Sequence, residues 1–106
     1  MLAALALLAV MIMTAPGVFA AGAVSDATAL AIVRKHCVMC HAVKPTHAAL
    51  QEAPKGVALE TIADLKKYAK AVYAQTVQNK AMPLGNKTGM TEDDRAALGR
   101  WLKALP

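Results

Sequence analysis

The 106-residue chain has little of several features that would define other classes of protein. No segment alternates apolar and polar side chains as a β-strand does, and no segment is repeated, which argues against sheet folds and repeat arrays. The chain has one Phe and no cluster of arginines despite a net charge of +5, so we expect no nucleic acid among its partners. A structural zinc site needs four ligands at workable geometry, whereas here His36, His41 and His47 crowd around only two cysteines.

The start of the chain contains no lysine or arginine before Arg34, and residues 2–13 carry no polar side chain. Pro16, Gly17 and the small-residue stretch 18–20 follow, an order typical of a cleaved export signal, although the usual positive start is missing. The alternative is a membrane anchor, or the last part of a transmembrane helix that begins elsewhere. A spanning helix needs about 20 apolar residues, and Thr14, Pro16 and Gly17 interrupt this run early. We therefore expect a leader over residues 1–23 and a folded domain over residues 24–106, located in the periplasm or on the outer face of the inner membrane.

Three helices are predicted in the rest of the chain, and the domain is therefore expected to be all-α. The first spans residues 26–37 with Asp26 as its N-cap, and its apolar positions recur at helical spacing together with His36. The second spans residues 60–79, where Thr61 and Asp64 form a capping box. The last begins after Thr91 with three acidic residues in its first turn. Irregular segments at 42–58 and 80–90 connect the helices.

The stretch Cys37-Val38-Met39-Cys40-His41 has the C-x-x-C-H pattern of covalent haem attachment. Two cysteines at this spacing can form thioethers with one haem, and the next residue then directs its imidazole toward the iron. A redox-active cysteine pair needs no following histidine, and it usually follows a strand. The motif therefore predicts one covalently bound haem c, with Cys37 and Cys40 as attachment points and His41 as an iron ligand.

The other ring nitrogen of His41 should donate its N–H to a backbone carbonyl, and we expect the loop around Pro54 to supply that carbonyl. Met82 is the leading candidate for the sixth iron ligand, because it lies in a loop beside a stiffening proline and has no evident packing role. Met90 is the alternative, but a hydrophobic residue just before a helix cap commonly packs on the helix start.

Histidines are weaker candidates for the sixth ligand. His47 follows His41 too closely to reach the opposite side of the haem, and we expect His36 on the surface of the first helix. Two axial protein ligands would leave no open site on the iron, which favours an electron carrier over a haem enzyme. A sensor or peroxidase with an open sixth site is the rival hypothesis.

The aromatic side chains have two interpretations. The polar tips of Tyr68, Tyr73 and Trp101 could hydrogen-bond a haem propionate, but such residues more often pack in the core. We expect Trp101 where the last helix meets the first.

The order of helix, C-x-x-C-H motif, proline loop, helix, Met-Pro loop and capped final helix resembles class I cytochrome c over residues 26–105. The resemblance implies three main helices wrapped around one covalently bound haem c, and electron exchange with redox partner proteins of a respiratory chain. It implies that Ala29 and Val33 lie where the first and last helices cross, without the usual glycine and aromatic residue. It also implies that the Pro54 carbonyl accepts a hydrogen bond from His41.

A narrower resemblance rests on residues 45–46, 53–57 and 82–91, where Met82-Pro83-Leu84-Gly85 continues to Thr91. These stretches resemble the C-terminal cytochrome domain of membrane-bound bacterial urate oxidases. The resemblance implies, as an alternative function, the electron-accepting part of a urate-oxidising enzyme with a membrane-embedded oxidase domain.

Overall fold

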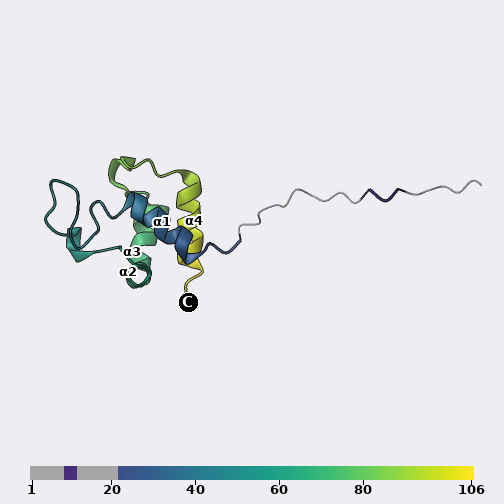
Figure 1. Ribbon diagram of the computed structural model, residues 1–106, viewed down its shortest axis with the longest axis horizontal. Coiled ribbons are helices and arrows are strands. Elements are labelled where there is room, and N and C mark those ends of the chain that lie inside the picture. The colour runs from purple at the N-terminus through teal and green to yellow at the C-terminus, as the bar shows by residue number, and fades with distance from the viewer. Residues whose placement is uncertain (1–8, 12–21) are drawn as a thin grey trace, which may run out of the picture.

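The computed structural model describes residues 9–11 and 22–106, and every regular element within them is helical (Figure 1), as predicted. The main helices are α1 (Asp26–His36), α2 (Ile62–Lys67), α3 (Ala69–Tyr73) and α4 (Glu92–Lys103). Shorter helical turns are η1 (Pro54–Gly56), η2 (Ala74–Gln78, π-helical) and η3 (Leu84–Asn86). Most of the predicted leader, residues 1–8 and 12–21, lies outside the described residues.

In the part of the chain that is described, no helix combines the length and the apolar character needed to cross a membrane.

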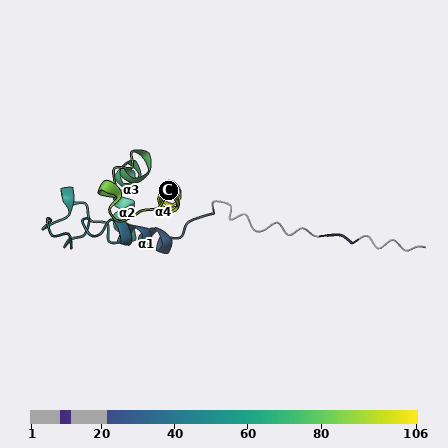
Figure 2. The same ribbon diagram turned by 90° about the horizontal axis from the view of Figure 1, so that it is seen from above.

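Helices α1 and α4 pack against each other, and both views of the ribbon place them side by side (Figures 1 and 2). Ala29 and Val33 of α1 are completely buried, which agrees with their expected place at the helix crossing. Trp101 of α4 is also buried, and its Nε1 donates a hydrogen bond of 2.8 Å to the Asp26 carboxylate at the start of α1. The indole therefore joins the two helices by packing and by its polar tip, as expected for this position.

The start of α1 differs from the prediction by one residue. Ser25, not Asp26, is the N-cap: its backbone is extended, and its hydroxyl accepts the N–H of Thr28 at 3.1 Å. Both residue types cap helices well, so the local sequence did not distinguish them. Asp26 is free to accept from Trp101 because Ser25 caps the helix.

The predicted helix over residues 60–79 is three consecutive pieces. Its beginning is confirmed, because Thr61 and Asp64 form the reciprocal capping box. The chain then turns at Tyr68, which separates α2 from α3, and continues into the π-helical turn η2. Thr76 in η2 is buried, and its hydroxyl donates to the carbonyl of Val72 at 2.7 Å. No Pro or Gly marks these breaks in the sequence.

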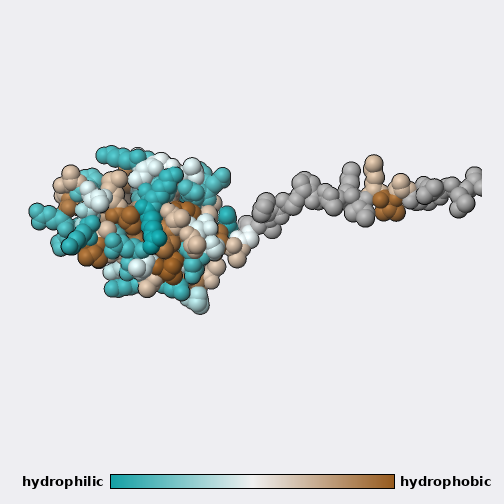
Figure 3. Space-filling model, in the orientation of Figure 1, coloured by the Kyte–Doolittle hydropathy of each residue, from teal (hydrophilic) through white to brown (hydrophobic). Residues whose placement is uncertain are grey.

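Helix α4 begins as predicted, with the Thr91 hydroxyl accepting the N–H of Asp94 at 3.1 Å. Gly99 allows α4 to approach η2 closely, because a Cβ at this position would lie 3.1 Å from Cγ2 of Val77. The core formed between these elements consists of buried side chains from every main helix and from two connecting segments: Ala29, Ile32, Val33, Leu59, Leu65, Val72, Met90, Leu98, Trp101 and Leu102. Outside it, apolar patches are interleaved with hydrophilic side chains on the face shown in Figure 3.

Candidate functional site

The C-x-x-C-H motif forms a tight turn at the end of α1. The N–H groups of Cys40 and His41 both donate to the carbonyl of Cys37, at 3.2 and 2.8 Å. The turn places both cysteines in half-buried positions directly beyond the helix, and their thiols are not joined by a disulfide. Two thiols and an imidazole are thereby presented from one short segment.

Burial, with a smaller contribution from neighbouring Cys40, raises the pKa of the Cys37 thiol to about 11. Reactive cysteines of disulfide oxidoreductases and metal-binding thiolates need the opposite shift, toward a lower pKa. Among residues 9–11 and 22–106, no three His, Cys, Asp or Glu side chains come together in a group that could hold a metal ion. The geometry therefore does not favour a zinc site or a dithiol redox centre.

His41 is half-buried, and its Nδ1 donates a hydrogen bond of 2.8 Å to a backbone carbonyl, as predicted. The acceptor is Val57, however, not Pro54. The Pro54 carbonyl instead accepts the N–H of Val57 at 3.1 Å, which closes the turn η1. Positive φ angles at Lys55 (55°) and Gly56 (70°) reverse the chain there. The carbonyl that reaches the His41 ring is therefore that of Val57, three residues after Pro54.

A second bond ties this loop to the motif. The N–H of Leu59 donates to the His41 carbonyl at 2.8 Å. The Val57 carbonyl can only accept, so Nδ1 of His41 carries the proton. Nε2 therefore keeps its lone pair for a metal. This arrangement orients an iron-ligating imidazole and raises its basicity.

Met82 is half-buried, and its backbone is held on both sides. Its N–H donates to the carbonyl of Gln75 at 3.0 Å, and its own carbonyl accepts from Nη1 of Arg95 at 2.9 Å. The same Nη1 also donates to the carbonyl of Thr76. The guanidinium of α4 therefore joins the π-helical turn to the residue predicted as the sixth ligand.

Met90 has the packing role that its position suggested. Only 4% of the residue is exposed, and it belongs to the core. Its N–H donates to Oδ1 of Asn86 and its carbonyl accepts from Nδ2 of Asn86, at 2.9 and 3.2 Å. The two methionines are thus distinguished by their surroundings, since Met90 is used in the core and Met82 is held in the loop by its backbone.

The expectation that His36 lies on the helix surface is wrong. The residue is 4% exposed, and its ring lies 2.8 Å from the Thr88 hydroxyl and 3.4 Å from the Asp94 carboxylate. His36 follows Ile32 and Val33 at helical spacing, so the periodicity already pointed to the buried face. His47, in contrast, is exposed, and its Nδ1 accepts the N–H of Ala49 at 3.1 Å.

Arg95 was missed by the sequence analysis. It is only 6% exposed although it is charged, and a charged side chain is rarely buried without strong partners. Its Nε has no hydrogen-bond partner in the described part of the chain, and the nearest carboxylate, of Glu92, is 3.6 Å away. The signal that could have found it is its spacing, because Arg95, Leu98 and Leu102 share one face of α4.

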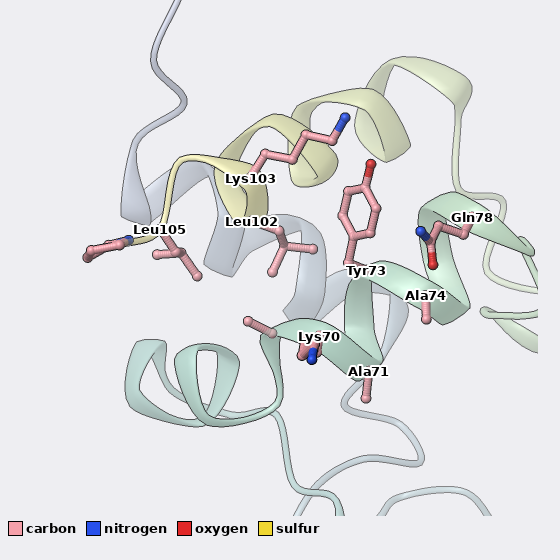
Figure 4. A pocket seen from close by; sticks show the side chains of 10 residues that line it. Lys70, Ala71, Tyr73, Ala74, Gln78, Leu102, Lys103 and Leu105 are labelled. Carbon is pink, nitrogen blue, oxygen red and sulfur yellow. The ribbon is translucent and has the colours of Figure 1, made fainter.

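The tyrosines lie beside lysines. The Nζ atoms of Lys67 and Lys103 are 5.1 and 5.5 Å from the ring centres of Tyr68 and Tyr73. Tyr73 and Lys103 also line an open groove between α3, η2 and the end of α4 (Figure 4). None of the motif residues lines this groove, so it is separate from the site.

The residues present suit a covalently attached haem. The motif offers two half-buried thiols without a disulfide and an imidazole oriented through its Nδ1, and the loop over residues 80–90 offers a methionine with an anchored backbone. These are the attachment and ligand types of a c-type haem.

Comparison with known proteins agrees with this chemistry. The family model described as cytochrome c matches residues 27–106. No curated protein and no solved structure matches the chain.

Proposed function

The chain belongs to the cytochrome c family, and we propose that it is an extracytoplasmic mono-haem electron carrier whose iron is ligated by His41 and Met82. Domains of this family bind haem c covalently and transfer electrons between redox partners. The observation that carries the proposed ligation is the contrast between the methionines. The Met82 backbone is anchored by Gln75 and Arg95, whereas Met90 is buried in the core.

Bound haem supplies an iron that changes its oxidation state by one electron, and His/Met ligation raises its reduction potential. The protein's own residues would attach the haem and orient the ligands of its iron. Cys37 and Cys40 attach the group, and the Val57 carbonyl orients His41 through the 2.8 Å hydrogen bond. Arg95 holds the backbone of Met82 from the other side of the fold. Because both axial positions would be filled by the protein, a substrate could bind only after a ligand leaves, which favours a carrier.

The surface near these residues supports docking of an acidic redox partner. Met39 of the motif, Val43 just beyond it and Leu84 of the Met82 loop are exposed apolar side chains, at 46%, 68% and 66%. The exposed Lys44 and Lys87 flank them in the sequence. Exposed apolar side chains with lysines close by in the sequence suit a transient complex, since positive charges accelerate encounter without strengthening the bound state greatly.

An extracytoplasmic location is proposed from the sequence. Haems of this type are attached outside the cytoplasm in bacteria, and residues 1–23 have the apolar character of an export signal or anchor. The exported protein would be periplasmic or held at the outer face of the inner membrane, where partners of a respiratory chain are available.

The ligation is tested by the visible spectrum of the purified oxidised protein, which shows a weak sulfur-to-iron charge-transfer band when methionine binds iron. We expect the band in the wild type and its loss in Met82→Leu. The matched control is Met90→Leu, which removes the other loop methionine with little change in volume and should keep the band.

Loss of the band in Met90→Leu and its survival in Met82→Leu would assign the ligand to Met90. A wild type without the band, but with rapid carbon monoxide binding after reduction, would refute the carrier and favour a sensor or peroxidase.

A second candidate function is the electron-accepting part of a membrane-bound urate-oxidising enzyme. It rests on the resemblance inferred from the sequence of residues 45–46, 53–57 and 82–91. The test is a search for a membrane oxidase domain encoded directly upstream, followed by urate-dependent reduction of the cytochrome in membranes containing both parts. An isolated gene, with no reduction by urate, would refute it.

A further inference from the structure

His36 joins the end of α1 to two consecutive segments that lie 52 and 58 positions further along the chain. It is the last residue of α1 and immediately precedes Cys37. Its side chain is fully buried, with Nδ1 2.8 Å from the Thr88 hydroxyl and Nε2 3.4 Å from the Asp94 carboxylate. Thr88 belongs to the loop that carries Met82, and Asp94 lies in the first turn of α4. One imidazole thus connects the haem-attachment helix with the loop of the proposed sixth ligand.

The polarity of this side chain needs an explanation, since an apolar residue would fill the space at no desolvation cost. A buried imidazole is tolerated only when its nitrogens are paired. The Asp94 carboxylate can only accept, so Nε2 donates its N–H to it, and Nδ1 pairs with the Thr88 hydroxyl. Both nitrogens are therefore used, and the shorter contact is the one to the loop.

The loop over residues 80–90 is held at its beginning by the backbone of Met82 and at its end by Met90, which is buried in the core. Arg95 and Gln75 fix Met82, as described above. The next backbone bonds stay within the loop, from Asn86 to Pro83, from Lys87 to Leu84 and from Gly89 to Asn86. The contact between Thr88 and His36 is the point at which the later half of the loop is tied to α1.

We propose that His36 is a positioning residue, which holds this loop closed over the site through Thr88 and so keeps Met82 available to the iron. The proposal rests on Met82 being the sixth ligand. It assigns His36 no contact with the cofactor. Its effect on the iron passes through the loop over residues 80–90. Because His36 adjoins Cys37, its hydrogen bond to Thr88 joins that loop to the attachment motif.

Loop closure can be measured by competition. Imidazole added to the oxidised holoprotein can bind iron only when the methionine has left, so its apparent affinity reports the fraction of open loop. Loss of one buried hydrogen bond should open the loop about fivefold more often, and should tighten apparent imidazole binding by about the same factor. We expect this for both His36→Leu and Thr88→Val.

The double variant should bind imidazole no more than about twofold tighter than either single one, because both substitutions remove the same contact. His36→Asn, whose amide can take the place of Nδ1, should restore much of the wild-type value. Lys35→Gln, at the exposed neighbouring position of α1, is the matched control and should leave the affinity unchanged.

The outcomes separate the two proposals. A wild type without the sulfur-to-iron band refutes the proposed ligation itself. A wild type with the band, together with unchanged imidazole affinity in Thr88→Val and in His36→Leu, overturns the role of His36 alone. Fully additive effects in the double variant would also overturn it. If His36→Leu fails to fold, Thr88→Val still decides the question, because it leaves the buried ring in place.

Discussion

Replacing Arg95 by methionine should destabilise the protein and weaken the anchoring of Met82 more than any other change of a charged residue on α4. Arg95 is 6% exposed, and its Nη1 donates to the carbonyls of Thr76 and Met82. Methionine has a similar length and can fill much of the space, but it offers no donor. Both carbonyls would then lose a charge-assisted partner.

The magnitude follows from two opposing contributions. Each carbonyl left without its donor costs about 1–3 kcal/mol in the free energy of unfolding. Removing the charge recovers part of this loss, because Nε is unpaired within the described residues and Glu92, 3.6 Å away, is 74% exposed and compensates the charge poorly. We therefore expect a net loss of about 2 kcal/mol.

The assay is urea unfolding of the holoprotein, followed by far-ultraviolet circular dichroism and by the sulfur-to-iron band. In Arg95→Met the midpoint should fall with an unchanged slope, and the band should disappear at lower urea than the helical signal, because the start of the Met82 loop has lost its anchor. Arg100→Met, an exposed arginine on the same helix, is the matched control. A loss below about 0.5 kcal/mol, or one equal to that of the control, would refute the structural role assigned to Arg95.

Two further predictions concern a helix cap and a thiol. Thr91→Ala removes the hydroxyl that accepts the N–H of Asp94, and it should lower the free energy of unfolding by about 1 kcal/mol in the same urea assay, while Thr91→Ser should not. In the haem-free chain, alkylation of Cys37 should rise through a pKa of about 11, above its ordinary value of 9.0, because burial favours the neutral thiol. The corresponding stabilisation is complete below pH 9.0 and is lost as the pH rises through about 11; an alkylation profile centred near 9.0 would show that the thiol is not buried.

Much of the fold followed from signals that act within a few residues. The caps at Thr61 and Thr91 need only the hydroxyl and the N–H groups of the next turn, so their positions were predicted correctly. The attachment motif is equally local, because its three functional residues lie on one turn. The predicted packing of Met90 and Trp101 also held, since both follow directly from helix position and periodicity.

Two of the errors involve partners that are distant along the chain. The carbonyl that orients His41 belongs to Val57, not Pro54, because the positive φ angles of η1 decide which carbonyl faces the ring. The predicted helix over residues 60–79 breaks at Tyr68, and further along, in the π-helical turn η2, the carbonyl of Thr76 accepts from Arg95, 19 residues away.

The sequence by itself determined the all-α class, the starts of α2 and α4 and the attachment chemistry, because each depends on residue types at short, regular spacing. Only the tertiary structure decided that His36 is buried against Thr88 and Asp94, and that Arg95 holds Met82. Such contacts pair donors and acceptors separated by 13 to 58 positions. The folded packing alone brings them together, and burial then makes each hydrogen bond matter, since no water can replace it.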